Sequence, residues 1–217
     1  MFVDRIDAAQ RLARALTQYR GQNPLVLAIP RGSVAMGKII AAALGGELDV
    51  VLVKKLRAPF SPEFAVGSID ESGWAYVASH AREAGADEAY LAREQAQQLA
   101  LLRQRRAQCT PARAPIDAAG RVAIVIDDGL ATGATMIAAL HSVRARQPRR
   151  LVCAVPVAAP QSLDAVAPYA DEVVCLTAPI EFQAVGQFYL SFPQVDDEFV
   201  IATLAESQVA AAKIKAP

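Results

Sequence analysis

Short, mainly apolar runs recur along the chain, and they constrain the fold more than any other feature. None of them alternates apolar and polar residues in the way that a strand with one wet face does. Runs that lack this alternation are typical of parallel strands covered by helices on both faces. Five runs of this kind occur: LVLAIP (25–30), ELDVVLVKK (47–55), RVAIVI (121–126), RRLVCAVPV (149–157) and DEVVCLTA (171–178). We therefore expect an α/β fold with a parallel five-stranded core sheet.

The segments between these runs predict helices on both faces of the sheet. Near the start of the chain, Ile6, Ala9, Ala13 and Leu16 recur at helical spacing, and Asp4 is suited to cap this helix. Further helices are expected at 33–44, 87–108, 134–146 and 161–170. Because no internal repeat or linker divides the chain, we expect a single domain over residues 1–217.

Residues 57–86 differ in character from the rest. They are rich in Pro, Gly and Ser, and some of their apolar residues alternate with polar ones. This composition predicts a flexible loop that leads into a hairpin.

The composition argues against several classes of partner. The chain has 217 residues, 53% of them apolar, so it is long enough to bury a core. Its 22 basic residues balance its 22 acidic residues, which removes the electrostatic footprint of a nucleic-acid or anionic-membrane binder. The apolar stretches fall short of the ~20 residues that cross a bilayer, and the start resembles no signal peptide. We expect a cytoplasmic protein with no nucleic-acid or membrane partner.

The cysteine and histidine content argues against a structural metal site. Cys109, Cys153 and Cys175 are odd in number and show no CxxC spacing, which favours reduced thiols. His80 and His141 lie far apart in the sequence, so a histidine-based zinc site is not expected.

The stretch VAIVIDDGLATGAT (122–135) carries the strongest functional signal. It joins an apolar run to two adjacent carboxylates, Asp127 and Asp128, which are unfavourable at the end of a buried strand unless something binds there. Gly129 and Gly133 permit tight turns, and the start of the next helix offers backbone N–H groups to a phosphate. Carboxylates beside a phosphate are favourable if they accept hydrogen bonds from the hydroxyls of its sugar. The stretch therefore predicts a diol clamp beside a monophosphate cradle, although a polar turn before a capped helix is the simpler alternative.

A different phosphate loop is the main rival. GSVAMGKI (32–39) nearly matches the Walker pattern G-x-x-x-x-G-K-[ST], and VAIVIDD would then be the acidic strand of a P-loop NTPase. The match fails at Ile39, which has no oxygen for a metal ion, and it leaves the TGAT residues unexplained. Lys38 is equally compatible with an exposed position on a helix.

Several stretches of the sequence resemble a known superfamily. AIVIDDGLATGAT is similar to the signature of type I phosphoribosyltransferases, and LAIPRGSVAMG looks like their pyrophosphate loop. The stretches VKKLRAPFSPEFAVGSI and ADEVVCLTAPIEFQAVGQFYLSFPQVDDEFV resemble a bacterial subgroup of predicted phosphoribosyltransferases whose acceptor is unassigned. The resemblance covers about residues 25–200.

The resemblance implies a donor, a cofactor and a set of site residues. The donor would be 5-phosphoribosyl-1-pyrophosphate (PRPP) with Mg²⁺, which the substrate would mainly hold, with no direct protein ligand and with Asp127 and Asp128 nearby. These two residues would bind the ribose hydroxyls and stabilise the positive charge of an oxocarbenium-like transition state. The residues that would hold the 5-phosphate are Ala131, Thr132, Gly133, Ala134 and Thr135. The pyrophosphate would meet Arg31, Gly32 and Ser33, and Gly129 would also belong to the substrate-binding residues. The resemblance also implies a cis peptide between Arg31 and Gly32, at a cost of ~3 kcal/mol.

Basic residues at the end of the second apolar run are the remaining candidates. Lys54, Lys55 and Arg57 would neutralise the departing pyrophosphate, although a solvated basic strand end is the plain alternative. Residues 57–80 would close over the site as a lid.

A hood region at 177–200 would cover the acceptor, and its aromatic residues are Phe182, Phe188, Tyr189 and Phe192. These residues are suited either to stacking on a planar ring or to packing. The sequence does not select an acceptor.

Two interpretations remain open within the superfamily. One is a phosphoribosyltransferase that displaces pyrophosphate with a nucleobase-like or other nitrogen acceptor. The other is a non-catalytic regulator that binds PRPP or a nucleotide, for which the same fold and donor site would suffice. The resemblance to this superfamily also suggests a homodimer.

Overall fold

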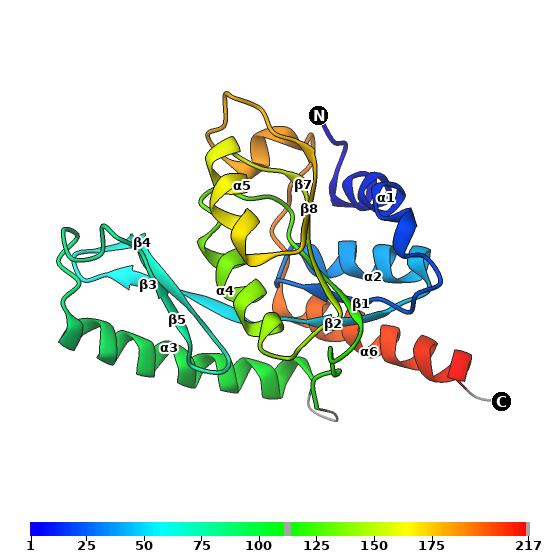
Figure 1. Cartoon of the computed structure of the whole chain (residues 1–217), viewed down its shortest axis with the longest axis horizontal. Coiled ribbons are helices and arrows are strands. Elements are labelled where there is room, and N and C mark those ends of the chain that lie inside the picture. Colours follow the sequence, from blue (N-terminus) through cyan, green and yellow to red (C-terminus); the bar gives the residue numbers. More distant parts are fainter. Residues whose placement is uncertain (111–113, 216–217) are drawn as a thin grey trace.

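The computed structural model describes residues 1–110 and 114–215, and a five-stranded parallel sheet forms its centre (Figure 1). The strand order is β2-β1-β6-β7-β8, and all four pairings are parallel. The strands are β1 (Leu25–Ala28), β2 (Glu47–Val50), β6 (Val122–Ile126), β7 (Arg150–Val157) and β8 (Glu172–Thr177). The predicted parallel core sheet is confirmed.

Helices cover both faces of this sheet, as Figure 1 shows. Val26 and Ala28 of β1 pack in one core with residues of α1 (Arg5–Ala15), α2 (Ser33–Leu44) and α6 (Asp197–Lys215). Their neighbours Leu25 and Leu27 pack in a second core with residues of α4 (Ala134–Arg144) and α5 (Pro160–Val166). Successive side chains of a strand point to opposite faces, so every residue of the central strands β1 and β6 is buried on one side or the other. This explains why the runs show no polar alternation.

The first helix starts where the sequence predicts. The Asp4 side chain accepts hydrogen bonds from the backbone N–H groups of Ile6 and Asp7, which are two of the donors that a helix start leaves unpaired. Leu12 and Leu16 are fully buried, whereas Ile6 is 52% exposed. Of the four apolar residues at helical spacing, Ile6 is therefore the one outside the buried stripe, which runs through Ala8, Ala9, Leu12 and Ala13.

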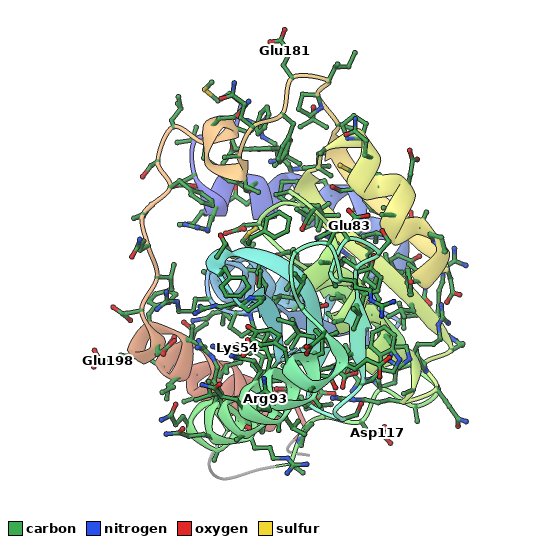
Figure 2. All side chains as sticks on the ribbon, turned by 90° about the vertical axis from the view of Figure 1, so that its left-hand side faces the viewer. Lys54, Glu83, Arg93, Asp117, Glu181 and Glu198 are labelled. Atoms are coloured by element: carbon green, nitrogen blue, oxygen red, sulfur yellow. The ribbon has the colours of Figure 1, made fainter. Side chains whose placement is uncertain are left out.

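A second sheet stands beside the core, and this corrects the expected loop. The run at 47–55 is two strands, because the chain leaves the core sheet after Val50 and continues as β3 (Val53–Ala58). With β4 (Ser61–Asp70) and β5 (Ala75–Val77), it forms a three-stranded antiparallel sheet. Helix α3 (Glu88–Cys109), capped by Asp87, packs along this sheet (Figures 1 and 2). The expected hairpin is present as β4 and β5, whereas the segment expected to be a loop before it is occupied by the end of β3 and the start of β4.

The segment after β8 returns across the top of the core. It contains a short 3-10 helix (Val185–Phe188), and Figure 2 shows Glu181 of this segment at one extreme of the molecule. Phe2 donates its backbone N–H to Phe188 and accepts one from Leu190, so this segment pairs with the N-terminal residues. Helix α6 begins at Asp197, inside the last residues of the expected hood region 177–200. Two further 3-10 helices are Thr17–Tyr19 and Ala167–Tyr169.

Candidate active site

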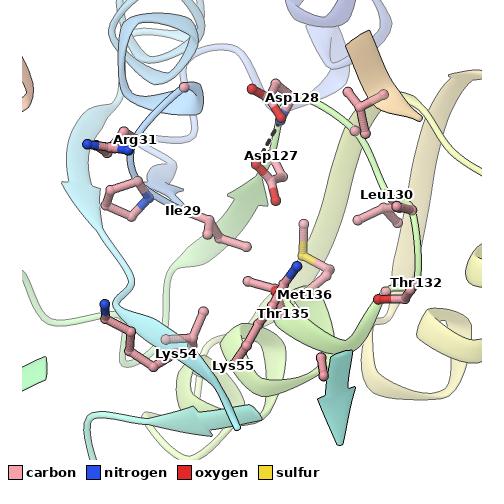
Figure 3. A pocket seen from close by; sticks show the side chains of 18 of the residues that line it. Ile29, Arg31, Lys54, Lys55, Asp127, Asp128, Leu130, Thr132, Thr135 and Met136 are labelled. Atoms are coloured by element: carbon pink, nitrogen blue, oxygen red, sulfur yellow. Dashed lines mark hydrogen bonds between the residues drawn. The ribbon is translucent and has the colours of Figure 1, made fainter. Parts of the chain in front are cut away.

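A cavity of about 680 Å³ opens at the carboxyl ends of β1 and β6, where open parallel sheets bind their ligands (Figure 3). Leu52 and Ala65 line it from the antiparallel-sheet side, and Val185 lines it from the segment after β8. The predicted site residues that line it are Arg31, Gly32, Lys54, Lys55, Arg57, Asp127, Asp128, Gly129, Ala131, Thr132, Gly133 and Thr135. The fold thus brings together residues as far apart in the sequence as Arg31 and Thr135.

Ser33 and Ala134 are placed differently from the other predicted residues. The Ser33 hydroxyl is buried and donates a hydrogen bond to the carbonyl of Ile29, so its side chain faces the protein. The Ala134 carbonyl accepts a hydrogen bond from Ser68 of β4 at 2.8 Å. Neither residue is among those that line the cavity. The Ser33 hydroxyl is therefore turned away from the cavity, and the role of Ser33 toward the pyrophosphate stays a prediction.

The loop after β6 is held from several sides. Gly133 has a φ of 77°, in the left-handed region that favours glycine, and it immediately precedes α4. The Ser162 hydroxyl donates to the carbonyl of Ala131 at 2.6 Å, and the Leu130 backbone N–H donates to Val157. A side chain at Gly129 would lie 2.6 Å from Val185. The first turn of α4 therefore reaches the cavity in a fixed position, with N–H groups that lack helical partners.

Asp127 and Asp128 differ in their surroundings. The Asp127 carboxylate accepts a hydrogen bond from the backbone N–H of Asp128 at 2.9 Å (dashed line in Figure 3). Burial and the neighbouring charge of Asp128 raise the pKa of Asp127 well above its usual value. Burial also raises the pKa of Asp128, and the hydrogen bond from Arg5 opposes this shift. The pair therefore favours Asp128 as the ionised member.

Arg5 is a residue that the sequence interpretation missed. Its Nε lies 2.8 Å from Oδ2 of Asp128, although 123 positions separate the two residues. On the other side of Asp128, the hydroxyl of Tyr189 donates to the backbone carbonyl at 2.7 Å. Burial raises the pKa of Tyr189, so its hydroxyl stays protonated and remains a donor. An arginine on an amphipathic helix gives no local signal of such a contact.

Gly32 is required for space rather than for its backbone angles. Its φ of −57° is ordinary helical geometry, so any residue could adopt it. A side chain there would collide with Oδ2 of Asp128 and lie 2.7 Å from Nε of Arg5. The non-proline cis peptide precedes Arg31, between Pro30 and Arg31, and the expected position between Arg31 and Gly32 is wrong.

The two lysines lie on β3 of the antiparallel sheet, and not at the end of a core strand as expected. Lys55 extends toward Asp127, whereas Lys54 lies on the same side as Arg31 (Figure 3). Burial, followed by the charges of Arg105 and Arg57, lowers the pKa of Lys54. Arg105 of α3 also lines the cavity and forms an ion pair with Asp197 at 2.5 Å. Arg105 had no signal in the sequence, because the helix that carries it looks solvated throughout.

The aromatic residues of the hood pack against one another rather than lining the cavity. The ring centroids of Phe182 and Phe188 are 5.3 Å apart, and those of Tyr189 and Phe192 are 4.8 Å apart. Val185 is the hood residue that lines the cavity, and no aromatic side chain of the described residues does so. Of the two roles considered for these aromatics, packing is the one the structure shows.

Oxygen ligands suited to Mg²⁺ are present, but only as a pair. Within residues 1–110 and 114–215, no group of three or more His, Cys, Asp or Glu side chains is placed to hold a metal ion. The carboxylates of Asp127 and Asp128 are hard oxygen donors, which Mg²⁺ prefers, and this ion usually keeps water and substrate phosphates as its other ligands. The residues present therefore fit a Mg²⁺ ion that arrives with a phosphate-bearing substrate.

The segment of the rival phosphate loop forms the start of α2. Residues 33–44 are helical, and Lys38 forms a surface ion pair with Glu206 at 2.6 Å. Lys38 and Ile39 are not among the residues that line the cavity. The Walker-type interpretation is therefore not supported. Separately, no helix in the described part of the chain is long and apolar enough to cross a membrane.

Comparisons with known proteins agree with this arrangement. The family model for the phosphoribosyl transferase domain matches residues 3–192. A Mycobacterium tuberculosis protein with the name "Putative phosphoribosyl transferase" is 40% identical over 205 residues, which cover 94% of this chain and 46% of that protein. The chain thus spans about half the length of the curated relatives it matches. The crystal structure of TT1426 from Thermus thermophilus is 45% identical, with a TM-score of 0.80 over 94% of this chain and 98% of that one.

The chain belongs to the phosphoribosyl transferase family. Its parallel five-stranded core with helices on both faces is the fold of the type I members.

Proposed function

We propose that this chain transfers the 5-phosphoribosyl group of PRPP to a nitrogen acceptor and releases pyrophosphate. The observation that carries the proposal is the adjacency of Asp127 and Asp128 to the first turn of α4 in one cavity. A phosphate cradle and a pair of hydroxyl acceptors match the two ends of a ribose 5-phosphate. Arg31, Lys54, Lys55 and Arg57 add positive charge on the side where the pyrophosphate would lie.

The roles follow from the placement of each group. The backbone of residues 131–135 would bind the 5-phosphate, and the side chains of Thr132 and Thr135 would add hydroxyl donors. Asp127 and Asp128 would accept hydrogen bonds from the ribose hydroxyls and stabilise the positive charge that develops on the sugar. The new bond joins the acceptor nitrogen to C1 of the ribose, and the bond that breaks joins C1 to the pyrophosphate oxygen.

The basic residues would stabilise the leaving group. Pyrophosphate departs with the electron pair of the broken bond, and Arg31 and the lysines of β3 would neutralise this charge. Mg²⁺, bound mainly through the donor itself, would supply further charge neutralisation. The proton lost by the acceptor nitrogen passes to solvent or to a basic group. We propose that residues 1–217 act as one domain and that the reaction takes place in the cytoplasm.

The test begins with donor binding. Titration of the protein with PRPP and Mg²⁺, and in parallel with ATP and Mg²⁺, should show micromolar binding of PRPP and little binding of ATP. The double variant Asp127→Asn with Asp128→Asn should lose PRPP binding while its thermal unfolding midpoint does not fall below that of the wild type. Preference for ATP, or full PRPP binding by the double variant, would contradict the donor assignment.

A second measurement separates an enzyme from a regulator. Pyrophosphate release should be followed with PRPP and a panel of nucleobases and other nitrogen acceptors. Release that depends on one acceptor, and that the double variant lacks, supports the transferase. Tight PRPP binding without release for any acceptor of the panel would favour the non-catalytic regulator.

A further inference from the structure

Arg5 joins three parts of the molecule at one point behind the cavity. Its Nε donates to Oδ2 of Asp128 at 2.8 Å, and its Nη1 donates to the backbone carbonyl of Pro193 at 2.8 Å. Its guanidinium lies 3.7 Å from the ring centroid of Phe192. An arginine held by two hydrogen bonds and a stacked ring has a single well-defined orientation.

The contact leaves one side of the Asp128 carboxylate for a ligand. Oδ2 is taken by Arg5, and the backbone carbonyl is taken by the hydroxyl of Tyr189. Within the described residues, no other residue donates a hydrogen bond to Oδ1, and Asp128 lines the cavity whereas Arg5 does not. Of the residues that line the cavity, Asp128 is the one that the Arg5 side chain contacts by a hydrogen bond, so Asp128 is the direct route from Arg5 to a ligand.

The ion pair of Arg5 and Asp128 is shielded enough from solvent for its two charges to interact strongly. The side chains of Arg5 and Asp128 are only 12% and 18% exposed. Ion pairs at such sites are screened less than surface pairs, and a carboxylate left there without its partner is unfavourable. The other titratable groups that face Asp128 are Asp127 and Tyr189, and neither brings a positive charge.

We propose that Arg5 is a positioning residue of the active site, which holds the Asp128 carboxylate so that Oδ1 faces the ribose hydroxyls of the donor. This inference rests on the proposed function. It also gives a reason for the glycine at position 32, since a side chain there would enter the space that Arg5 and Asp128 share.

A purely structural role for Arg5 makes different predictions. Its contacts with Phe192 and Pro193 tie α1 to the hood, so a loss of stability alone does not distinguish the two roles. A structural residue would weaken PRPP binding equally whether or not Asp128 carries a charge. A positioning residue would lose its effect once that carboxylate is removed.

The experiment is a double-mutant cycle on PRPP binding. Arg5→Gln should weaken the binding of PRPP and Mg²⁺ by about tenfold or more, as expected for the loss of a charge-assisted hydrogen bond at the ligand-binding carboxylate. Arg5→Lys should restore part of the affinity. In an Asp128→Asn background, Arg5→Gln should change affinity by less than about twofold. Arg14→Gln is the matched control, because Arg14 is an exposed arginine on the same helix.

An undiminished effect of Arg5→Gln in the Asp128→Asn background would overturn the proposal. So would wild-type affinity in Arg5→Gln itself. A loss of affinity in Arg14→Gln equal to that in Arg5→Gln would also overturn it, because the effect would then reflect the charge of the helix.

A readout without PRPP separates this inference from the proposed function. Carbon-13 NMR of the aspartate carboxyls in the free protein, assigned with Asp127→Asn and Asp128→Asn, should show a higher pKa for Asp128 in Arg5→Gln than in the wild type. If the wild type fails to bind PRPP, the proposed donor is wrong, and an unchanged Asp128 titration would independently exclude control by Arg5.

Discussion

Ser68 of β4 donates its hydroxyl hydrogen to the backbone carbonyl of Ala134 at 2.8 Å, which ties the antiparallel sheet to the first turn of α4. Ser68 is fully buried, so removal of its hydroxyl leaves that carbonyl without this donor. We expect Ser68→Ala to lower the free energy of unfolding by about 1 kcal/mol. Urea denaturation measures the change, with Ser79→Ala as an exposed control on the same segment. Equal losses of stability in Ser68→Ala and Ser79→Ala would argue against a stabilising role for the hydrogen bond between Ser68 and Ala134.

The pH dependence of the free energy of unfolding, measured without ligand, should reflect the pKa of Asp127. Its pKa is raised in the folded state, so between the unfolded and folded pKa values the folded protein binds more protons. The free energy of unfolding attributable to Asp127 therefore falls as the pH rises through this window, from about pH 4 upward. Asp127→Asn removes this dependence, so the variant should gain stability relative to the wild type as the pH rises.

Urea denaturation at several pH values, without Mg²⁺ or PRPP, checks this expectation. Asp164→Asn, at an exposed position of α5, provides the control. A gap between Asp127→Asn and the wild type that is the same at every pH would show that Asp127 keeps an ordinary carboxyl environment in the folded state.

Gly32→Ala should damage the site although alanine suits the local backbone. The collision with Asp128 and the close approach to Arg5 require these side chains to shift. We expect PRPP affinity to fall by about tenfold or more, and the free energy of unfolding to fall by about 1–3 kcal/mol. Calorimetric titration and thermal unfolding measure the two effects. Wild-type affinity in Gly32→Ala would mean that the arrangement of Arg5 and Asp128 is not needed for the donor.

Lys55 and Lys38 should differ sharply as ligand-binding residues. Lys55 reaches into the cavity toward Asp127, whereas Lys38 is paired with Glu206 on the surface. Lys55→Gln should weaken PRPP binding by about tenfold, and Lys38→Gln should leave it nearly unchanged. Parallel titrations with PRPP and with ATP provide the comparison. The opposite result would restore the Walker-type loop as a phosphate site.

Much of the core follows from local sequence patterns. The five parallel strands and the bounds of α2 could be predicted, because burial on both faces leaves continuous apolar runs and helices leave a different spacing. The Asp127–Thr135 loop was also recognisable, since its glycines and carboxylates are adjacent in the chain. The antiparallel sheet was missed in part because the run at 47–55 shows no break where the chain leaves the core after Val50.

The parts of the site that were missed depend on long-range contacts. Arg5 and Arg105 are charged residues on helices, and nothing in their neighbours shows that they point toward the cavity. The aromatic residues of the hood show the reverse case. Phe182 and Phe188 are suited by residue type to stack on a ligand, but in the fold they pack against each other. Tertiary packing sets the direction in which side chains of distant elements point, and the local spacing of residues in the sequence does not indicate this direction.

Asp49 of β2 anchors the segment that carries β3, β4, β5 and α3. The carboxylate of Asp49 accepts the backbone N–H of Ile116 at 2.8 Å, and Arg106 donates to the carbonyl of Val50 at 2.9 Å. The segment therefore departs from and returns to the same edge strand of the core, and none of the parallel strands lies within it. Changes of length or sequence between these anchor points need not alter the register of the core sheet. For protein engineering, the turns that join β3, β4 and β5 are therefore natural places to insert residues while the parallel core is kept constant.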